Sequence, residues 1–192
     1  MEHAATWMGT IEAAEGQIAE LADFDALVRQ YRPRIFRFLL GSLRDRDSAE
    51  SICQEVFLKA YKARSGFRGE ASVQTWLMQI AVNRMRDYLR NRRLQFWRQL
   101  MVQSTAAEEI ADSLPDGGMS PEKQVIARQQ ASAVWRAAQD LSNNQRTVFL
   151  LRFVEDMDIE EIVVATGMKP TTVKTHLSRA LQNVRNRLGN TR

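Results

Sequence analysis

Apolar residues recur at steps of three and four along most of the chain, the spacing that places them on one face of an α-helix. The first run starts at Phe24 and continues to Leu39. Pro33 lies inside this run and lacks the amide that its helical turn requires, so it predicts a kink or the start of a second segment. A second helix is expected to begin near Asp47 and Ser48. Its predicted buried face consists of Ala49, Ile52, Cys53, Val56, Phe57, Ala60 and Tyr61.

A third helix is predicted after the loop SGFRGEAS, whose two glycines favour turns over helix. Ser72 is placed to cap its first turn. Its predicted inner face consists of Val73, Trp76, Leu77, Ile80, Ala81, Tyr88 and Leu89. We expect these three helices to form one bundle.

The apolar spacing fades between residues 99 and 120, where acidic residues, Ala, Ser and the turn sequence PDGG accumulate. This composition is typical of a linker. Ser120 followed by Pro121 then fits a helix start, with a capping side chain and a proline in the first turn. That helix is expected to continue to Leu141.

Two capping boxes follow, in which a small polar residue and an acid or amide three positions later satisfy each other's backbone amides. They pair Ser142 with Gln145 and Asp158 with Glu161. The second box opens a short helix that should end at Gly167, and a final helix is expected over 170–189.

No alternating strand pattern of useful length and no internal repeat is present, so we predict an all-α protein. It should have two small helical domains joined by a flexible acidic linker, with a helix-turn-helix in the C-terminal domain. The predicted boundaries are 1–23 for a disordered N-terminal extension, 24–98 for the N-terminal domain, 99–120 for the linker and 121–192 for the C-terminal domain.

The composition is that of a globular protein. Hydrophobic residues make 44% of the 192 positions, charged residues make 26%, and only 9 Gly and 4 Pro are present, which excludes collagen-like and wholly disordered chains. No apolar run approaches the roughly 18 residues of a membrane span, and the N-terminus lacks the pattern of a signal peptide. We therefore expect a cytoplasmic protein without stable membrane insertion.

The sequence contains few residues that could serve as catalytic groups or metal ligands. Cys53 is the only cysteine, and the two histidines, His3 and His176, are far apart in sequence. This excludes a zinc cluster built on several cysteines and makes a Cys/His catalytic pair improbable. Without a phosphate loop or dinucleotide motif either, we predict no enzyme, no metal, no cofactor and no small-molecule substrate.

The net charge is only +4, but the charges are segregated. The first 25 residues and the stretch 99–122 contain acids and no Lys or Arg, whereas the final 24 residues contain six basic residues and no acid. A second basic cluster consists of Arg84, Arg86, Arg90, Arg92, Arg93 and Arg98, beside the single acid Asp87. Two separated basic segments indicate two contact points on a polyanion.

The C-terminal basic segment follows a short helix and a glycine turn, the order of a helix-turn-helix. Ile162, Val173 and Leu177 are expected to hold its two helices together. The polar side chains left to face the major groove are Thr171, Thr172, Lys174, Thr175, Ser178 and Arg179. An ordinary solvated helix remains the alternative, although such a face usually mixes acids with bases.

The first basic cluster follows the loop GFRGEAS. Phe67 in this loop, Trp76 and Asn83 on the next helix, and the arginines beyond them supply an aromatic platform, an amide and cations. These are the parts needed to hold an unstacked, single-stranded base. A core position is the alternative reading of Trp76.

A resemblance to a known family rests on three blocks of sequence: DRDSAESICQEVFLKAYKARSGFRGEASVQTWLMQIAVNRMRDYLRNRR, LSNNQRTVFLLRF and the helix-turn-helix. Together they resemble the extracytoplasmic-function (ECF) group of bacterial sigma factors, over about residues 20 to 98 and 121 to 189. The resemblance implies a subunit that binds core RNA polymerase, recognises two promoter elements, helps to melt the DNA and directs transcription of a stress or envelope-type regulon.

The resemblance also implies roles for individual residues. The polymerase contact is expected at Glu50, Gln54 and Glu55. The minus-ten element is expected at Phe67, Arg68, Ser72, Trp76, Asn83, Arg86 and Arg90, with a flipped base received by the loop. The minus-thirty-five element is expected at Pro170, Thr171, Thr172, Lys174, Thr175, Ser178 and Arg179.

The implied partners are promoter DNA, the clamp of the largest polymerase subunit, the flap of the beta subunit and an anti-sigma factor. The sequence departs from the family pattern at Ser51, where an acid is usual, at Val163, where alanine is usual, and at Thr171, where glycine is usual. These changes are expected to affect the polymerase contact, the crossing of the two helices and the DNA-facing surface, respectively.

Two other classes of protein remain as alternatives. The sequence TVKTHL also resembles the recognition helix of response-regulator output domains, which would make the chain a transcriptional regulator that is not a polymerase subunit. Such a protein would carry an N-terminal receiver of alternating strands and helices, and the first hundred residues show no such pattern. A helical adaptor without sequence-specific DNA contact is the other alternative.

Overall fold

The computed structural model describes residues 21–100, 138 and 140–189, and all regular structure in these ranges is helical. The elements in chain order are α2 (Phe24–Leu43), α3 (Arg46–Ala63), the 3₁₀ turn η1 (Arg64–Gly66), α4 (Val73–Leu100), α6 (Asn143–Phe153), α7 (Ile159–Thr166) and α8 (Pro170–Gly189). The predicted linker beyond residue 100 and the predicted helix start at Ser120 lie outside the described residues.

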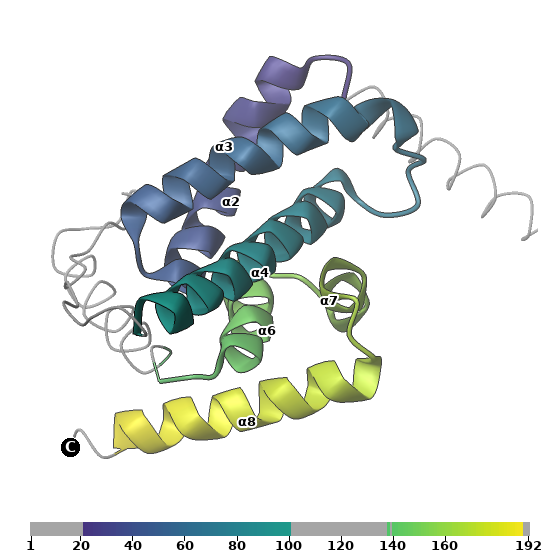
Figure 1. The fold of residues 1–192 in the computed structure, drawn as a ribbon. Coiled ribbons are helices and arrows are strands. Elements are labelled where there is room, and N and C mark those ends of the chain that lie inside the picture. Colours follow the sequence, from purple (N-terminus) through teal and green to yellow (C-terminus); the bar gives the residue numbers. More distant parts are fainter. Residues whose placement is uncertain (1–20, 101–137, 139, 190–192) are drawn as a thin grey trace, which may run out of the picture.

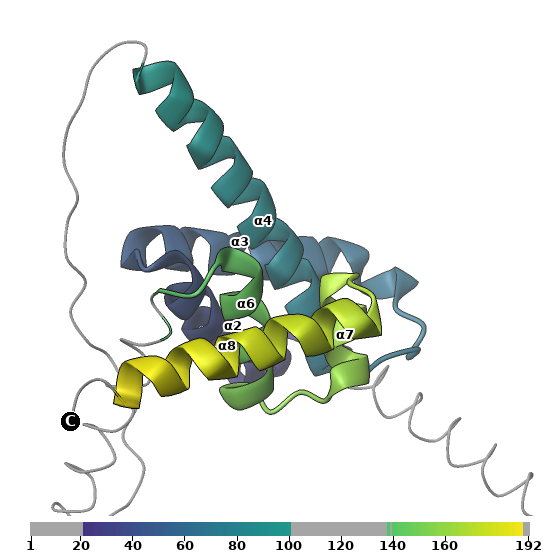
Figure 2. The ribbon, with the colours of Figure 1, turned by 90° about the horizontal axis from the view of Figure 1, so that it is seen from below.

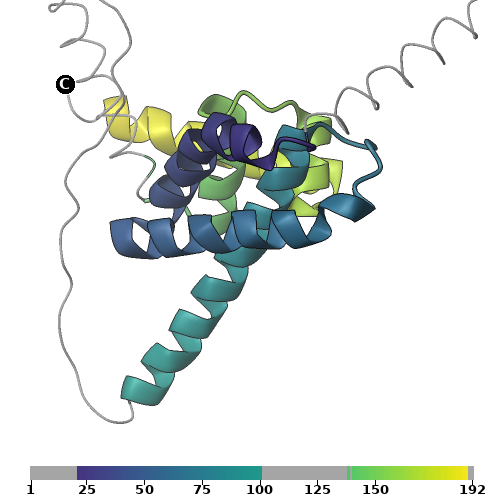
Figure 3. The ribbon, with the colours of Figure 1, turned by 90° about the horizontal axis from the view of Figure 1, so that it is seen from above.

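The helices α2, α3 and α4 pack together as the predicted bundle (Figure 1). Its core includes Phe38, Val56 and Leu77, all fully buried. Burying each of these side chains contributes about 1.5–3 kcal/mol to folding. The C-terminal end of α4 extends beyond the other helices (Figures 2 and 3).

The helices α6, α7 and α8 form a second group, in which Leu150, Ile162 and Val173 are fully buried. Helix α7 packs against α4, and α6 packs against α2, so the two groups share an interface. In Figure 1, α4 accordingly lies between α3 and the pair formed by α6 and α7.

The predicted helix starts in the described part of the chain are confirmed. Ser72 Oγ accepts a 3.1 Å hydrogen bond from the amide of Thr75, and both predicted capping boxes are formed. Helix α3 begins one residue before Asp47, with Asp45 as its cap. Gly167 ends α7 in the left-handed conformation, with φ of 67°, which glycine adopts without steric cost.

Several sequence-based expectations for the N-terminal bundle were wrong. Of the two outcomes predicted for Pro33, a kink or a second segment, the second segment is wrong, because α2 continues through it. Pro33 and Arg29, whose carbonyl would have accepted the missing amide, are both exposed, so water can satisfy that carbonyl. Leu21, which was assigned to the N-terminal extension, is buried in the core. Helix α4 also runs two residues past the predicted boundary at 98.

Tyr61 is 47% exposed, although the helical spacing predicted it in the buried face of α3. Its ring makes an edge contact with Phe24 at 5.2 Å between centroids, and the Arg64 guanidinium lies 3.6 Å from its centre. These neighbours cover one side of the ring near the end of the helix and leave the other side in water.

Candidate nucleic-acid interface

A pocket of about 490 Å³ lies between the loop after η1 and helix α4. Its lining residues are Gly66, Phe67, Arg68, Glu70, Ala71, Trp76, Gln79 and Val164. The rings of Phe67 and Trp76 lie 5.1 Å apart at an interplanar angle of 52°. Two aromatic rings beside a cation and an amide provide stacking surfaces together with polar groups for hydrogen bonds, the requirements for holding an unstacked base.

The loop is held in place by local hydrogen bonds. The amide of Phe67 donates to the carbonyl of Arg64 at 3.2 Å, and Gly69 adopts a left-handed φ of 70°. At the other end of the loop, Ser72 caps α4. The two aromatic rings are therefore presented by a turn and a helix start that are both fixed by the backbone.

The residues predicted for the minus-ten element lie along one stretch of loop and helix. Phe67, Arg68 and Trp76 line the pocket, and the structure brings them together. Asn83 is exposed farther along α4, outside the pocket lining. Arg90 is exposed and forms an ion pair with Asp87 at 2.8 Å.

Arg86 is placed differently from the other predicted minus-ten residues. It is half-buried, and its Nη1 donates a 2.6 Å hydrogen bond to the carbonyl of Thr166 at the end of α7. In this arrangement, Arg86 contacts the C-terminal group of helices.

The helix-turn-helix consists of α7, the turn at Gly167 and α8. As predicted, Ile162, Val173 and Leu177 are buried between the helices. The predicted DNA-facing residues Pro170, Thr171, Lys174, Thr175, Ser178 and Arg179 are exposed, and Thr172 is half-buried. The exposed residues form one face of α8 that combines hydroxyl groups with two cations and has no acid, a suitable surface for a duplex.

The three departures from the family pattern leave this framework intact. Ser51 is exposed on α3. Val163 is half-buried against the core, and its carbonyl accepts the capping bond from Gly167 at 2.8 Å. Thr171 is exposed, and its carbonyl accepts a bond from the Thr175 hydroxyl at 2.8 Å.

The predicted polymerase-facing residues lie on the solvent side of α3. Gln54 is exposed, Glu50 forms an ion pair with Arg32, and Glu55 forms one with Arg84. On the same helix, Leu58 is 56% exposed. Leu58 and Tyr61 follow Gln54 at steps of four and three and extend this face with apolar surface. Sequence reasoning missed both, although the i, i+4, i+7 spacing could have found them.

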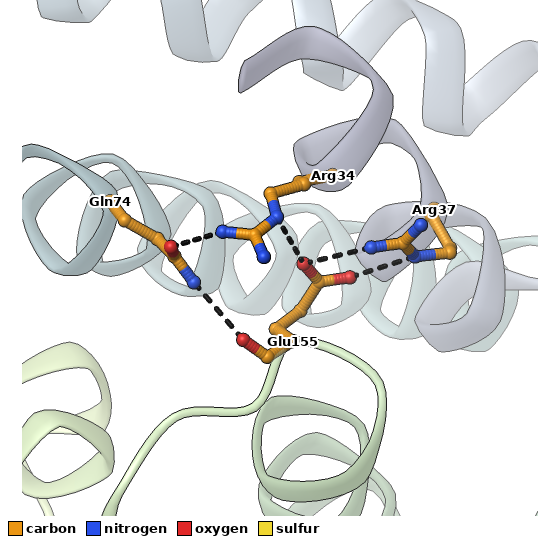
Figure 4. A network of polar contacts seen from close by, with 4 residues as sticks. All are labelled: Arg34, Arg37, Gln74 and Glu155. Carbon is orange, nitrogen blue, oxygen red and sulfur yellow. Dashed lines mark hydrogen bonds and ion pairs between the residues drawn. The ribbon is translucent and has the colours of Figure 1, made fainter. Parts of the chain in front are cut away.

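Glu155 forms a polar network between the two groups of helices (Figure 4). Its carboxylate is fully buried and accepts two hydrogen bonds from Arg37, at 3.0 and 3.2 Å. Arg34 Nε lies 3.9 Å from the same carboxylate, and Gln74 Nε2 donates to the Glu155 carbonyl at 3.1 Å. Burial raises the pKa of Glu155, and the bond from Arg37 opposes that rise.

Arg146 makes a second buried link. It donates to the carbonyls of Ala138 at 3.2 Å and Leu141 at 2.7 Å, and to that of Ser42 in α2 at 3.3 Å. Burial, followed by the nearby Arg44, lowers the pKa of Arg146 to about 10, so the side chain stays charged at neutral pH. Sequence reasoning missed both Glu155 and Arg146, because the partners that join them to the N-terminal bundle, Arg37 and Ser42, lie more than a hundred positions away.

The described residues contain no group of three or more His, Cys, Asp or Glu side chains arranged to hold a metal ion. Cys53 is buried as predicted, and burial raises the pKa of its thiol to about 11, which makes it a poor nucleophile at neutral pH. No helix in the described ranges is both long and apolar enough to cross a bilayer.

Comparison with known proteins assigns each of the two groups of helices to a protein family. The family described as Sigma-70 region 2 matches residues 27–95, and the family described as Sigma-70, region 4 matches residues 131–184. The RNA polymerase sigma-H factor of Pseudomonas aeruginosa is 28% identical, over 84% of this chain and 83% of the relative. The ECF RNA polymerase sigma factor SigW of Bacillus subtilis is 26% identical, over 86% of this chain and 88% of the relative. The chain belongs to the ECF group of the sigma-70 family.

Two solved structures share this fold. The structure of the sigma factor RpoE in complex with the anti-sigma factor NepR from Bartonella quintana matches with a TM-score of 0.68 at 21% identity, over 88% of this chain and 99% of that one. CnrH in complex with the cytosolic domain of CnrY matches with a TM-score of 0.60 at 18% identity, over 94% of this chain and 95% of that one.

In sigma-70 terms, region 2 comprises α2, α3 and most of α4, and the region 4 match extends over α6, α7 and most of α8. The pocket therefore belongs mainly to region 2, and Val164 is contributed by region 4. The resemblance seen in the sequence is confirmed, and the response-regulator alternative is not favoured, because the N-terminal half matches a sigma region.

Proposed function

We propose that this chain is a sigma factor that binds core RNA polymerase, recognises two promoter elements and directs transcription initiation at a particular set of promoters. The observation that carries this proposal is the presence of two sigma regions in one chain, each with its own candidate DNA surface. A helix-turn-helix regulator would need only the second of these surfaces.

The region 2 pocket supports a role in melting. A base that leaves the duplex stack costs a few kcal/mol, and stacking on aromatic rings offsets part of that cost. Phe67 and Trp76 supply the rings, and Arg68 also lines the pocket. Ser72 caps the adjacent helix α4, and Asn83 supplies an exposed amide farther along that helix. Arg86 and Arg90 would contact the neighbouring phosphates.

The exposed face of α8 supports recognition of an upstream duplex element. Short hydroxyl side chains reach phosphates and base edges, and Lys174 and Arg179 pair well with phosphate or guanine. Pro170 and Thr171 bring the first turn of this helix to the groove. With the linker as tether, the two regions would hold two separate promoter elements.

The α3 face with Gln54, Leu58 and Tyr61 supports binding to polymerase, since it combines polar groups with exposed apolar surface. Glu50 and Glu55 at its edge would add charged contacts to the clamp of the largest subunit, and region 4 would contact the flap of the beta subunit. The chain would act by binding alone, without a catalytic step, in the cytoplasm where the polymerase works.

An anti-sigma factor is a further expected partner, since two of the matching solved structures are of complexes, one with an anti-sigma factor and one with the cytosolic domain of CnrY. The proposed function is tested first by mixing the purified chain with core RNA polymerase and separating the mixture by gel filtration. Co-elution with core polymerase supports the proposal. Separate elution at micromolar concentrations of both components would contradict it.

A further inference from the structure

Arg44, at the corner between α2 and α3, is unfavourably placed in both its backbone and its side chain. Its φ of 59° is left-handed, a conformation that residues with a side chain adopt rarely. Its Nε and Nη2 are buried and have no hydrogen-bond partner among the described residues. A buried donor without a partner destabilises the fold, and more strongly when it belongs to a charged group. Strained and unsatisfied groups of this kind cluster at ligand sites.

The two unpartnered nitrogens of Arg44 lie on one edge of its guanidinium group. On that edge, Nε and Nη2 carry parallel N–H bonds, which can donate to two oxygens of the same phosphate or carboxylate group. Ser42, two positions earlier, is only 6% exposed, and its hydroxyl also lacks a hydrogen-bond partner in the part of the chain that the structure describes. The hydrogen bonding at this end of α2 is therefore incomplete.

Positive charge exceeds negative charge around this corner. Arg146 of α6 reaches the end of α2, where its Nη1 donates to the Ser42 carbonyl at 3.3 Å. Asp140 acts electrostatically on both Arg44 and Arg146, but its Oδ2 lies 2.5 Å from Arg187 Nη2, and its side chain is 53% exposed. Among the described residues here, one half-exposed carboxylate therefore serves three guanidinium groups.

Arg44 and Arg146 also repel each other. Burial lowers the pKa of Arg44, and burial followed by the charge of Arg44 lowers the pKa of Arg146. Because an arginine keeps its proton at neutral pH, titration does not relieve this repulsion. A water molecule can accept hydrogen bonds from Arg44, but it carries no charge to offset the repulsion. An anion provides both the acceptors and the charge.

We propose that Arg44 and Arg146 form a binding site for a small phosphate group, either inorganic phosphate or the phosphate of a nucleotide. The Nε and Nη2 edge of Arg44 donates to two phosphate oxygens, and Arg146 supplies a second positive charge. A phosphate monoester carries a charge of about −1.5 to −2 at pH 7, which matches two guanidinium groups better than a carboxylate does. The donors are buried, so the site takes a small anion rather than the backbone of a duplex.

This inference does not depend on the proposed function, because the site contains none of the residues assigned to promoter DNA or to polymerase. The test measures phosphate binding to the purified full-length chain alone. Isothermal titration calorimetry is carried out with inorganic phosphate and, separately, with AMP, in phosphate-free buffer at constant ionic strength. Both ligands are titrated into the wild-type chain and into each variant.

Arg44→Gln removes the guanidinium group and its charge but keeps a flexible polar side chain at the same backbone position. Arg29→Gln is the matched control, since it loses the same charge at an exposed position of α2. We expect saturable binding by the wild type and by Arg29→Gln, and at least about tenfold weaker binding by Arg44→Gln. Arg44→Lys keeps the charge but loses the parallel donors, so its affinity should lie between those of the wild type and Arg44→Gln.

The two ligands identify the source of the phosphate. Tighter binding of AMP, lost in Arg44→Gln, assigns the site to a nucleotide, whereas equal or weaker binding of AMP assigns it to the free ion. The proposal is wrong if the wild type binds neither ligand saturably, since water then satisfies the buried nitrogens. It is also wrong if Arg44→Gln binds as tightly as the wild type, since the anion then binds elsewhere.

If Arg44→Gln does not fold, Arg44→Lys makes the same comparison, with weaker binding expected and wild-type affinity as the contrary result. The proposed function is judged separately, by co-elution of the chain with core polymerase. If co-elution is observed while the wild type binds no phosphate, only the phosphate site is wrong.

Discussion

The guanidinium of Arg86 donates a 2.6 Å hydrogen bond to the backbone carbonyl of Thr166, the last residue of α7. The final carbonyls of a helix lack intrahelical partners and carry a partial negative charge, so a cation from another segment stabilises them. Arg86 thus caps a region 4 helix with a side chain that is proposed to hold promoter DNA.

Asn83→Ala is expected to reduce promoter opening more than initial binding. Asn83 is exposed on α4, where an amide can reach an extruded base, and its loss should remove hydrogen bonds that form only in the melted state. Permanganate footprinting should show several-fold less reactive thymine with little change in duplex affinity. Unchanged melting in the variant would count against this role of Asn83.

Lys174→Ala and Arg179→Ala are expected to weaken binding to the upstream element and to lower its salt dependence. Each lost phosphate contact should reduce the slope of log affinity against log salt by about 1. Arg185→Ala is the control, because Arg185 is exposed on the same helix but outside the predicted DNA-facing set. Equal slopes for all three variants and the wild type would refute the assignment of this face.

Leu58→Ala is expected to weaken the association with core polymerase. Leu58 is 56% exposed beside Gln54, and the burial of apolar surface is the dominant favourable term in most protein–protein association. We expect about fivefold weaker binding by fluorescence anisotropy. Lys59→Ala, an exposed neighbour that points to a different side of α3, should bind like the wild type, and equal loss in both variants would remove the special role of Leu58.

Arg44→Gly is expected to stabilise the chain against urea. Arg44 ends α2 with a φ of 59°, a left-handed conformation that favours glycine, and its Nε and one terminal nitrogen are buried without a hydrogen-bond partner in the described part of the chain. Burial also lowers the pKa of Arg44, which means that the charged form is disfavoured there. Arg44→Gly should exceed Arg44→Ala by about 1 kcal/mol in the free energy of unfolding, and the reverse order would contradict the backbone argument.

Mild acid is expected to favour the packing of region 4 on region 2. Burial between the two regions raises the pKa of Glu155 above the ordinary value of 4.5, so the packed chain binds a proton at this carboxyl more tightly than a chain in which Glu155 is in water. The groups that face it are Arg34 and Arg37 from α2 and the neutral amide of Gln74 from α4. The radius of gyration should fall as the pH is lowered toward 4.5, the ordinary pKa of the carboxyl group, and Glu155→Gln should lose this dependence. Expansion of the wild-type chain over that range would contradict the sign.

The starts and ends of the helices could be predicted from sequence, because the residues that determine them lie close together in the chain. The capping boxes at Ser142 and Asp158 and the glycine turn at Gly167 each depend on residues within one or two helical turns, and the structure confirms all three. The buried positions of the helix-turn-helix follow from the same short spacing. The second segment predicted at Pro33 does not form, because the cost of a proline inside a helix depends on whether water reaches the free carbonyl, which is a tertiary property.

The interface between the regions could not be predicted from sequence. Arg37 and Glu155 are 118 positions apart, and neither stands in a pattern that distinguishes it from other surface charges. The candidate site was predicted only in its region 2 part: Phe67 and Trp76 meet as expected, whereas Val164 reaches the same pocket from region 4. Contacts of this kind depend on how two separate apolar faces meet, and helical periodicity carries no information about that.

The most direct test of the central claim is to map transcript 5′ ends on sheared genomic DNA, using purified core polymerase with and without this chain. The account predicts new start sites that share two sequence elements at a constant spacing upstream, and that disappear when the chain carries both Lys174→Ala and Asn83→Ala. Start sites identical to those of core polymerase alone would contradict it.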